Sequence, residues 1–142
     1  MLIQFALMAA IVASGVVGPG WPGGRQVVVV GVVVALAGAA VAVSAGRALG
    51  RNLTPFPRPS RGAELVERGP YRLVRHPIYS GGLLSFVGVS LILSPVALAV
   101  TVVLAVVWAL KAHLEETFLR AAYPDYADYC LRTPARLVPF VY

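Results

Sequence analysis

Long uncharged, apolar stretches are the feature that most constrains how this chain can fold. One covers residues 1–17, a second covers 26–46 after a turn rich in Gly and Pro, and a third covers 78–110. A helix needs about 20 apolar residues to cross a bilayer, so the third stretch is too long for a single span. With 58% of its 142 residues hydrophobic and only 13% charged, the chain carries more apolar surface than a soluble domain of this size can bury. We therefore predict an integral membrane protein.

The third stretch is predicted to form a helical hairpin. Ser94 and Pro95 fall near its middle, where a proline removes a helix hydrogen bond but suits the first turn of a new helix. The alternative is one long helix that is kinked or tilted. The second stretch is rich in Val, yet it lacks the alternation of a membrane strand, so we expect a helix there too. Its small residues would allow close packing against another helix: Gly31, Gly38, Ala39, Ala42 and Gly46.

The predicted fold class is all-α, an integral membrane protein that forms a single domain over residues 1–142. The first stretch also has the length of a signal peptide, but it lacks the positively charged start of one, so we expect it to be retained. Four transmembrane helices are expected at about residues 1–18, 26–46, 76–94 and 95–112. A cytoplasmic central loop is expected at 47–75, and a cytoplasmic carboxy-terminal segment at 113–142.

Positive charge sets the predicted orientation. Residues 47–77 contain seven arginines, whereas Arg25 is the only basic side chain between the first two spans. Because basic loops stay on the cytoplasmic side, we expect both termini and the central loop to be cytoplasmic, in the plasma (inner) membrane of a bacterium. A net charge of +6 could suggest nucleic-acid binding, but the apolar spans argue against it. Topology and contact with anionic lipids suffice to explain four of the arginines: Arg47, Arg51, Arg58 and Arg61.

Most of the familiar catalytic and metal-binding patterns are absent from the sequence. Cys130 is the single cysteine and there are two histidines, so an internal disulfide, a CxxC redox motif and a His-rich metal site are excluded. The nucleotide-binding patterns and the GxSxG and HExxH patterns of hydrolases do not occur either. Any chemistry must therefore come from the two polar regions that remain.

The first polar region covers residues 69–82 and leads into the third predicted helix. It reads Gly-Pro-Tyr-Arg-Leu-Val-Arg-His-Pro-Ile-Tyr-Ser-Gly-Gly. Pro77 suits a first helical turn and pushes His76 out of helical geometry, and backbone N–H groups at a helix start attract anions. A belt of Tyr and Arg at the membrane interface explains Tyr71, Arg72 and Tyr79 adequately. It explains the His-Pro pair and the two glycines poorly.

The second polar region follows the fourth predicted span and contains two adjacent acidic residues, Glu115 and Glu116. A carboxylate at the end of a span is costly unless it has a partner or a ligand. The two side chains point about 100° apart on a helix, so one could bind a ligand cation while the other pairs with Arg75 or Arg120. A solvated helix face with the i,i+4 pairs Lys111–Glu115 and Glu116–Arg120 is the plainer alternative.

A short helix is expected within residues 121–139. Asp125 is a candidate cap for this helix, and Tyr126 and Tyr129 fall on one face at i,i+3. The helix could lie on the membrane surface or close over a site. Cys130 is expected to be a packed thiol, because no base accompanies it.

Together the two polar regions resemble the isoprenylcysteine carboxyl methyltransferase family. Residues 69–81, GPYRxxRHPxYxG, are similar to its first signature, and the glutamate pair with the later tyrosines, Arg136 and Pro139 is similar to its second block. The resemblance covers residues 69–139, and related membrane enzymes, including phospholipid N-methyltransferases, share the fold and the glutamate pair. The amino-terminal half is similar in hydropathy only and the chain is shorter than eukaryotic members, so their prenylated-protein substrates are not carried over.

The resemblance implies a membrane methyltransferase that uses S-adenosylmethionine at the cytoplasmic face. It implies that Arg75 and Arg136 serve catalysis, Arg75 by orienting the cofactor carboxylate or the acidic pair and Arg136 by closing the site. The expected acceptor is a lipophilic small molecule or lipid that bears a carboxylate, thiol or amine. No metal is expected. The glycine-rich second span could support a homodimer. The cofactor contacts implied are Tyr71, His76, Tyr79, Gly81, Glu115 and Glu116.

Two other interpretations stay open. Residues 133–142 also resemble the carboxyl terminus of membrane sterol reductases, which use NADPH and contain a similar RHPxY block. Those proteins are much longer and usually lack the glutamate pair in this form. The other alternative is a non-catalytic membrane scaffold, although a scaffold has little reason to keep charges at the end of a span.

Overall fold

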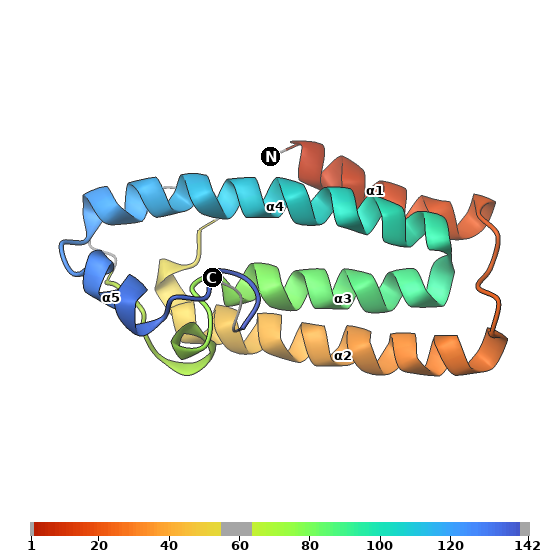
Figure 1. Cartoon of the computed structure of the whole chain (residues 1–142), viewed down its shortest axis with the longest axis horizontal. Helices are drawn as coiled ribbons and strands as arrows, with labels where there is room; N and C mark the ends of the chain where they lie inside the picture. The colour runs from red at the N-terminus through yellow and green to blue at the C-terminus, as the bar shows by residue number, and fades with distance from the viewer. Residues whose placement is uncertain (1, 55–63, 140–142) are drawn as a thin grey trace. The chain divides into compact units, whose positions relative to one another are not determined.

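The computed structural model describes residues 2–54 and 64–139, and the part of the chain that it describes is helical and contains no strand. The expected all-α class is therefore confirmed for these residues (Figure 1). The predictions for Arg58 and Arg61 and for residues 140–142 fall outside the described residues. The elements are α1 (Leu2–Val17), α2 (Gly24–Leu49), the 3₁₀ turns Gly50–Asn52 and Gly69–Arg72, α3 (Pro77–Leu93), α4 (Pro95–Ala122) and α5 (Tyr126–Arg132).

The chain divides into two compact units, and α2, α3 and α4 each contribute residues to both. We call Met1–Ala40 with Gly81–Trp108 the apolar unit, and Val41–Ser80 with Ala109–Tyr142 the polar unit. The apolar unit contains α1 and most of the hydrophobic helix length. The polar unit contains α5 and every charged residue of the two motifs predicted from the sequence.

Among the residues that the structure describes, two helices are long and apolar enough to cross a bilayer. The most apolar part of the α2 span has a mean hydropathy of 2.7, and 11% of it is buried. The most apolar part of α4 has a mean hydropathy of 2.1, and 28% of it is buried. So much exposed apolar surface favours lipid as the surrounding solvent. The shorter helices α1 and α3 are also apolar. Four helices therefore lie where four spans were predicted, but only α2 and α4 have the length of a full span, and the four-span topology stays a prediction.

The predicted hairpin at Ser94 and Pro95 is confirmed. Helix α3 ends at Leu93 and α4 begins at Pro95, so the alternative of one long helix is wrong. Ser94 is fully buried, and its hydroxyl accepts a hydrogen bond of 3.1 Å from the backbone N–H of Ala97. Ser94 thus caps the first turn of α4. Pro95 suits this turn because it has no backbone N–H group that would need an acceptor.

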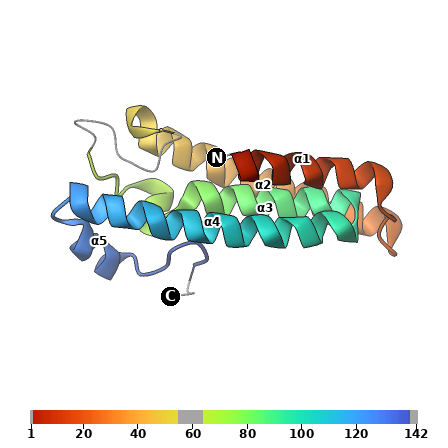
Figure 2. The same cartoon turned by 90° about the horizontal axis from the view of Figure 1, so that it is seen from above.

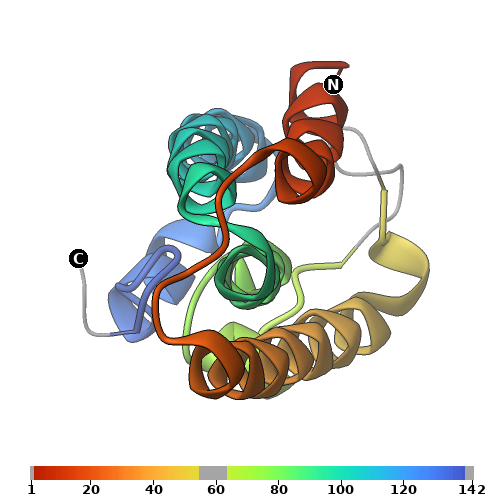
Figure 3. The same ribbon diagram turned by 90° about the vertical axis from the view of Figure 1, so that its right-hand side faces the viewer.

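Within the apolar unit, α3 lies beside α2, and both Figures 1 and 3 show the pair adjacent. A Cβ added at Gly38 would stand 2.4 Å from the backbone nitrogen of Ser85, and one at Gly88 would stand 2.3 Å from that of Ala35. Glycine at these positions lets the two backbones touch. The predicted packing role of Gly31 and Gly38 is confirmed, whereas a Cβ at Gly46 would meet nothing within 4 Å, so Gly46 makes no such contact.

These glycines provide a matched pair of substitutions. Gly88→Ala places a methyl group against backbone that cannot move aside, and overpacking of this kind costs about 1–3 kcal/mol. Gly46→Ala places the same methyl group in open space and improves helix propensity by up to about 1 kcal/mol. Thermal unfolding in detergent should show a lower Tm for Gly88→Ala and an unchanged or higher Tm for Gly46→Ala. Equal Tm values for the two variants would contradict the close α2–α3 contact.

Helix α4 is longer than the predicted fourth span. The span was expected to end near residue 112, and the helix continues past that point to Ala122, so it carries the glutamate pair on a regular helix. Leu, Lys, Glu and Arg are good helix formers, so nothing in this stretch stops the helix before Pro124. Helix α5 then lies next to the last turns of α4 (Figures 1 and 2), where the guanidinium of Arg120 sits 5.8 Å from the ring centroid of Tyr126.

Candidate functional site

The polar unit joins the segment before α3 to the carboxy-terminal segment by backbone hydrogen bonds. The N–H groups of Arg75 and His76 donate to the carbonyls of Ala135 and Arg136, both at 3.0 Å. Pro77 begins α3 as predicted, which leaves these two N–H groups outside the helix and free to pair with the distant segment. The two signature blocks are therefore held against each other by main chain as well as by side chains.

Glu116 is the centre of the site and is almost fully buried. Its side chain is 4% exposed and its Oε1 accepts from Arg75 Nε at 2.8 Å. Arg136 donates to both carboxylate oxygens, at 3.1 Å to Oε1 and 3.2 Å to Oε2. Two charge-assisted contacts on one carboxylate form a strong arrangement. Glu116 thus pairs with Arg75, one of the partners considered for the glutamate pair, and no Glu116–Arg120 ion pair is found among the described residues.

Arg75 also fixes the carboxy-terminal segment. Its Nη1 donates to the carbonyl of Thr133 at 2.7 Å and to that of Pro134. Burial alone would lower the pKa of Arg75, but the hydrogen bond and charge of Glu116 raise the pKa above its ordinary value. The guanidinium therefore stays charged and joins three parts of the chain. This is one of the two roles that the resemblance implied for Arg75, namely orienting the acidic pair.

Glu115 has a different set of neighbours and is more accessible, with 16% of its side chain exposed. Its Oε1 accepts from the phenol of Tyr79 at 2.7 Å and lies 4.0 Å from Nζ of Lys111. Its Oε2 lies 3.6 Å from Nδ1 of His76. The two glutamates thus point in different directions, as the helical rotation predicted. The i,i+4 pair Lys111–Glu115 of the plainer alternative is present as well.

His76 lies between the two carboxylates. Its ring stacks on Tyr79 with centroids 5.8 Å apart and an interplanar angle of 11°. Its Nε2 is 3.4 Å from Oε1 of Glu116, and it forms no hydrogen bond of standard geometry with a described residue. Buried polar atoms are nearly always satisfied, so this atom is a candidate for contact with a ligand.

The structure brings together six of the eight residues predicted for the site: Arg75, His76, Tyr79, Glu115, Glu116 and Arg136. Tyr71 belongs to the same unit, where its carbonyl accepts from the phenol of Tyr129 at 2.7 Å. Burial, and then the charge of Glu115, raise the pKa of Tyr71 to about 12. Gly81 belongs to the apolar unit. A Cβ built on Gly38 would lie 2.6 Å from the carbonyl oxygen of Gly81, so the observed role of Gly81 is close helix packing.

Several residues beside the site were not predicted to belong to it. Tyr126 and Tyr129 on α5 are 1% and 2% exposed, and their i,i+3 spacing was the sequence signal for a common buried face. Arg132 donates to Glu67 at 2.6 Å, a pairing across 65 residues that no local pattern indicates. Asp125 precedes α5 as expected, but its side chain makes no capping hydrogen bond, so that expectation was wrong.

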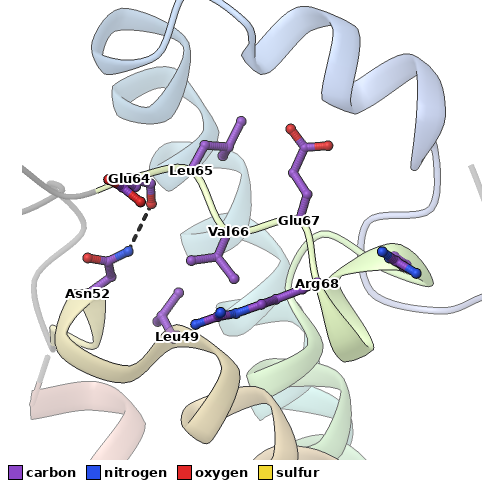
Figure 4. Close-up of a pocket in the computed structure, with 8 residues that line it drawn as sticks. Leu49, Asn52, Glu64, Leu65, Val66, Glu67 and Arg68 are labelled. Atoms are coloured by element: carbon purple, nitrogen blue, oxygen red, sulfur yellow. Dashed lines mark hydrogen bonds between the residues drawn. The ribbon is translucent and has the colours of Figure 1, made fainter.

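The polar unit also contains a separate cavity of about 380 Å³ (Figure 4). Figure 4 shows the amide of Asn52 reaching toward the backbone of Glu64, to whose carbonyl it donates at 2.8 Å. None of the predicted site residues lines this cavity, so it is distinct from the cluster around Glu116. Its lining residues are Leu49, Asn52, Glu64, Leu65, Val66, Glu67, Arg68 and Arg72.

Comparison with known proteins identifies the family. The sequence model of the family described as phospholipid methyltransferase matches residues 27–126, which is more than half of the chain. The chain belongs to this family. It is the membrane methyltransferase family to which the isoprenylcysteine carboxyl methyltransferases are related, so the predicted resemblance is confirmed.

Two curated proteins are similar to part of the chain. The cobalt-zinc-cadmium resistance protein CzcN of Cupriavidus metallidurans is 44% identical over 75 residues, which is 50% of this chain and 34% of CzcN. The nickel-cobalt-cadmium resistance protein NccN of Alcaligenes xylosoxydans xylosoxydans is 34% identical over 77 residues, 53% of this chain and 36% of NccN. The chain therefore spans about a third of the length of these two relatives.

Proposed function

We propose that this protein transfers a methyl group from S-adenosylmethionine to a lipophilic acceptor, in the manner of an isoprenylcysteine carboxyl methyltransferase. The observation that carries the proposal is the cluster in which Glu115, Tyr79 and His76 rest on the buried network of Glu116 with two arginines. Membership of the phospholipid methyltransferase family supports the reaction class. When bound, S-adenosylmethionine supplies a methyl group on a positively charged sulfur, ready for transfer to a nucleophile.

The residues of the cluster fit the chemical groups of this cofactor. Glu115 has a partly exposed carboxylate that can accept from an ammonium group, whereas the oxygens of Glu116 already accept from two guanidinium groups. Arg136 is 39% exposed and can offer its remaining donors to a carboxylate. The unsatisfied Nε2 of His76 is a further polar contact. We assign ammonium recognition to Glu115, carboxylate recognition to Arg136 and a supporting role to Glu116 and Arg75.

The acceptor is proposed to be a lipid or lipophilic small molecule bearing a carboxylate, thiol or amine. A carboxylate acceptor needs only orientation and removal of water, and the protein then needs no general base. Helix α4 carries the glutamate pair beyond its apolar length, and as a membrane span it would hold the cluster close to the bilayer in which such a molecule dissolves. The arginines of the loop favour a cytoplasmic position for the cluster and for both ends of the chain, with α1 and α3 as further spans.

The reductase alternative has less support. No described feature favours NADPH over S-adenosylmethionine, and the family match covers the glutamate pair that sterol reductases usually lack. The names of the two relatives refer to metal resistance. If this chain shares in such a process, we propose that its contribution is the methylation of a membrane component.

The proposal is tested by methyl transfer in membranes that contain the protein. S-adenosylmethionine with a tritiated methyl group is added, and the membranes are extracted with organic solvent. We expect label in the organic phase that requires the protein and is suppressed by S-adenosylhomocysteine. Glu115→Gln should reduce it strongly at low cofactor concentration, while the same change at the exposed Glu64 should not. Organic-phase label no higher than in membranes without the protein would contradict the proposal.

A further inference from the structure

Ser80 lies in the first turn of α3, and its hydroxyl joins this helix to the carboxy-terminal segment. The hydroxyl is within hydrogen-bonding distance of two carbonyls, that of His76 at 3.1 Å and that of Leu137, which is 57 residues away in the sequence. A hydroxyl donates one proton at a time. The carbonyl of His76 already accepts from the backbone N–H of Ser80 at 3.1 Å, so the hydroxyl proton is available for Leu137.

A serine inside a helix often has only a local role. Its hydroxyl bonds back to the carbonyl four residues earlier, and a serine with that bond alone could be replaced by alanine at little cost. The contact with Leu137 is different, because it connects two segments that are distant in the sequence. Both residues belong to the polar unit, which also contains the cluster around Glu116.

Three successive carbonyls of the carboxy-terminal segment are held by the chain around the start of α3. Those of residues 135 and 136 accept from two backbone N–H groups, both at 3.0 Å, and that of Leu137 accepts from Ser80. The first two donors are main chain and exist whatever the side chains are. The third exists only because residue 80 carries a hydroxyl, so this side chain sets the register of the segment on the far side of Arg136.

The position of this segment determines where the side chain of Arg136 begins. The Nε and Nη2 groups of Arg136 each donate to Glu116, which uses two of the five N–H donors of a guanidinium. No further hydrogen bond to a described residue uses the other three, and 39% of the side chain is exposed. Donors of this kind recognise a ligand only when they are held within a fraction of an ångström, so the backbone beneath Arg136 must be fixed.

We propose that Ser80 is a positioning residue for the cofactor. Its hydrogen bond to Leu137 fixes residues 135–137 against α3 and thereby places the remaining donors of Arg136 where they bind the cofactor carboxylate. This inference rests on the proposed function and adds a residue that acts through Arg136 rather than by touching the ligand. The effect of Ser80 should therefore depend on whether the ligand has a carboxylate.

The test measures calorimetric binding of two ligands to variants of the purified full chain. One ligand is S-adenosylhomocysteine, and the other is its decarboxylated analogue, which keeps the amino group. Ser80→Ala should weaken binding of S-adenosylhomocysteine about three- to tenfold, the effect of one lost hydrogen bond, and should leave binding of the analogue unchanged. Ser80→Thr keeps the hydroxyl and should bind both ligands like wild type.

Ser85→Ala is the matched control in the same helix. The hydroxyl of Ser85 also donates to a distant carbonyl, that of Ala35 at 3.2 Å, but it belongs to the apolar unit. This variant should bind both ligands like wild type. Thermal unfolding of each variant without ligand confirms that the protein measured is folded.

The outcomes separate this inference from the proposed function. Binding of S-adenosylhomocysteine by Ser80→Ala as tight as that of wild type would overturn the inference. An equal loss of affinity for both ligands would also overturn it, because the serine would then have a general structural role. Failure of folded wild type to bind S-adenosylhomocysteine at all would overturn the proposed function itself.

Discussion

Glu116→Gln is expected to lower the free energy of unfolding by about 3–5 kcal/mol, the usual cost of removing one partner from a buried ion pair. The substitution keeps the shape of the side chain but leaves Arg75, whose side chain is 8% exposed, without its countercharge. It also replaces one carboxylate oxygen with an NH2 group, so Arg136 keeps at most one of its two acceptors on this side chain. Denaturant unfolding in mild detergent measures the effect, and cofactor binding should be lost together with the fold.

Two matched substitutions control for the change of charge. Glu64→Gln removes a carboxylate from an exposed position, so the free energy of unfolding should change by no more than about 0.5 kcal/mol. Glu115→Gln, one residue from Glu116, should cost less than Glu116→Gln because its side chain is more exposed. If Glu116→Gln unfolded at the same denaturant concentration as Glu64→Gln, the assignment of Glu116 as the structural centre would be wrong.

Glu115→Gln is expected to weaken binding of S-adenosylhomocysteine about 10- to 100-fold with little loss of stability. A hydrogen bond between a carboxylate and an ammonium group is worth about 1.5–3 kcal/mol, which corresponds to that range of affinity. Gln keeps an oxygen for the phenol of Tyr79 but has no charge for the ammonium. Calorimetric titration of the purified variant measures the dissociation constant, and thermal unfolding in parallel measures the fold.

The comparison between the two glutamates is the informative part of this experiment. Both have the same side chain and adjacent positions, yet we expect one to act mainly on stability and the other mainly on affinity. A Glu115→Gln variant that binds as tightly as wild type would show that the ligand ammonium is held elsewhere. If Tyr79 and His76 contact the cofactor, the cofactor would then have to bind in a different orientation.

Much of the fold was predictable because it depends on local sequence. Apolar stretches located the helices, and Ser94 with Pro95 located the hairpin, since a capping side chain and a missing N–H act within one turn. The hydrophobic pattern ends near residue 112 but helix propensity does not, which is why α4 continues past the end of the predicted fourth span. Gly46 looked like Gly31 and Gly38 in the sequence, but only a partner helix decides which glycine makes a contact.

The sequence predicted which residues would gather at the candidate site, but not how they are arranged. The rotation between Glu115 and Glu116 indicated that they would have different partners, and the resemblance supplied the residues that gather around them. Which arginine reaches which glutamate depends on contacts across 41 and 20 residues, and no periodicity encodes those distances. The pairing of the Arg75 and His76 backbone with residues 135 and 136 was likewise invisible, because it requires the tertiary fold to exist first.

The most direct test of the account is calorimetric titration of the purified protein in detergent with S-adenosylhomocysteine, with NADPH as the comparator. We expect saturable binding of S-adenosylhomocysteine that Glu115→Gln weakens and Glu64→Gln leaves unchanged, and no binding of NADPH. Binding of NADPH instead would assign the cluster to a reductase. Binding of neither ligand by demonstrably folded protein would contradict the claim that this cluster is a cofactor site.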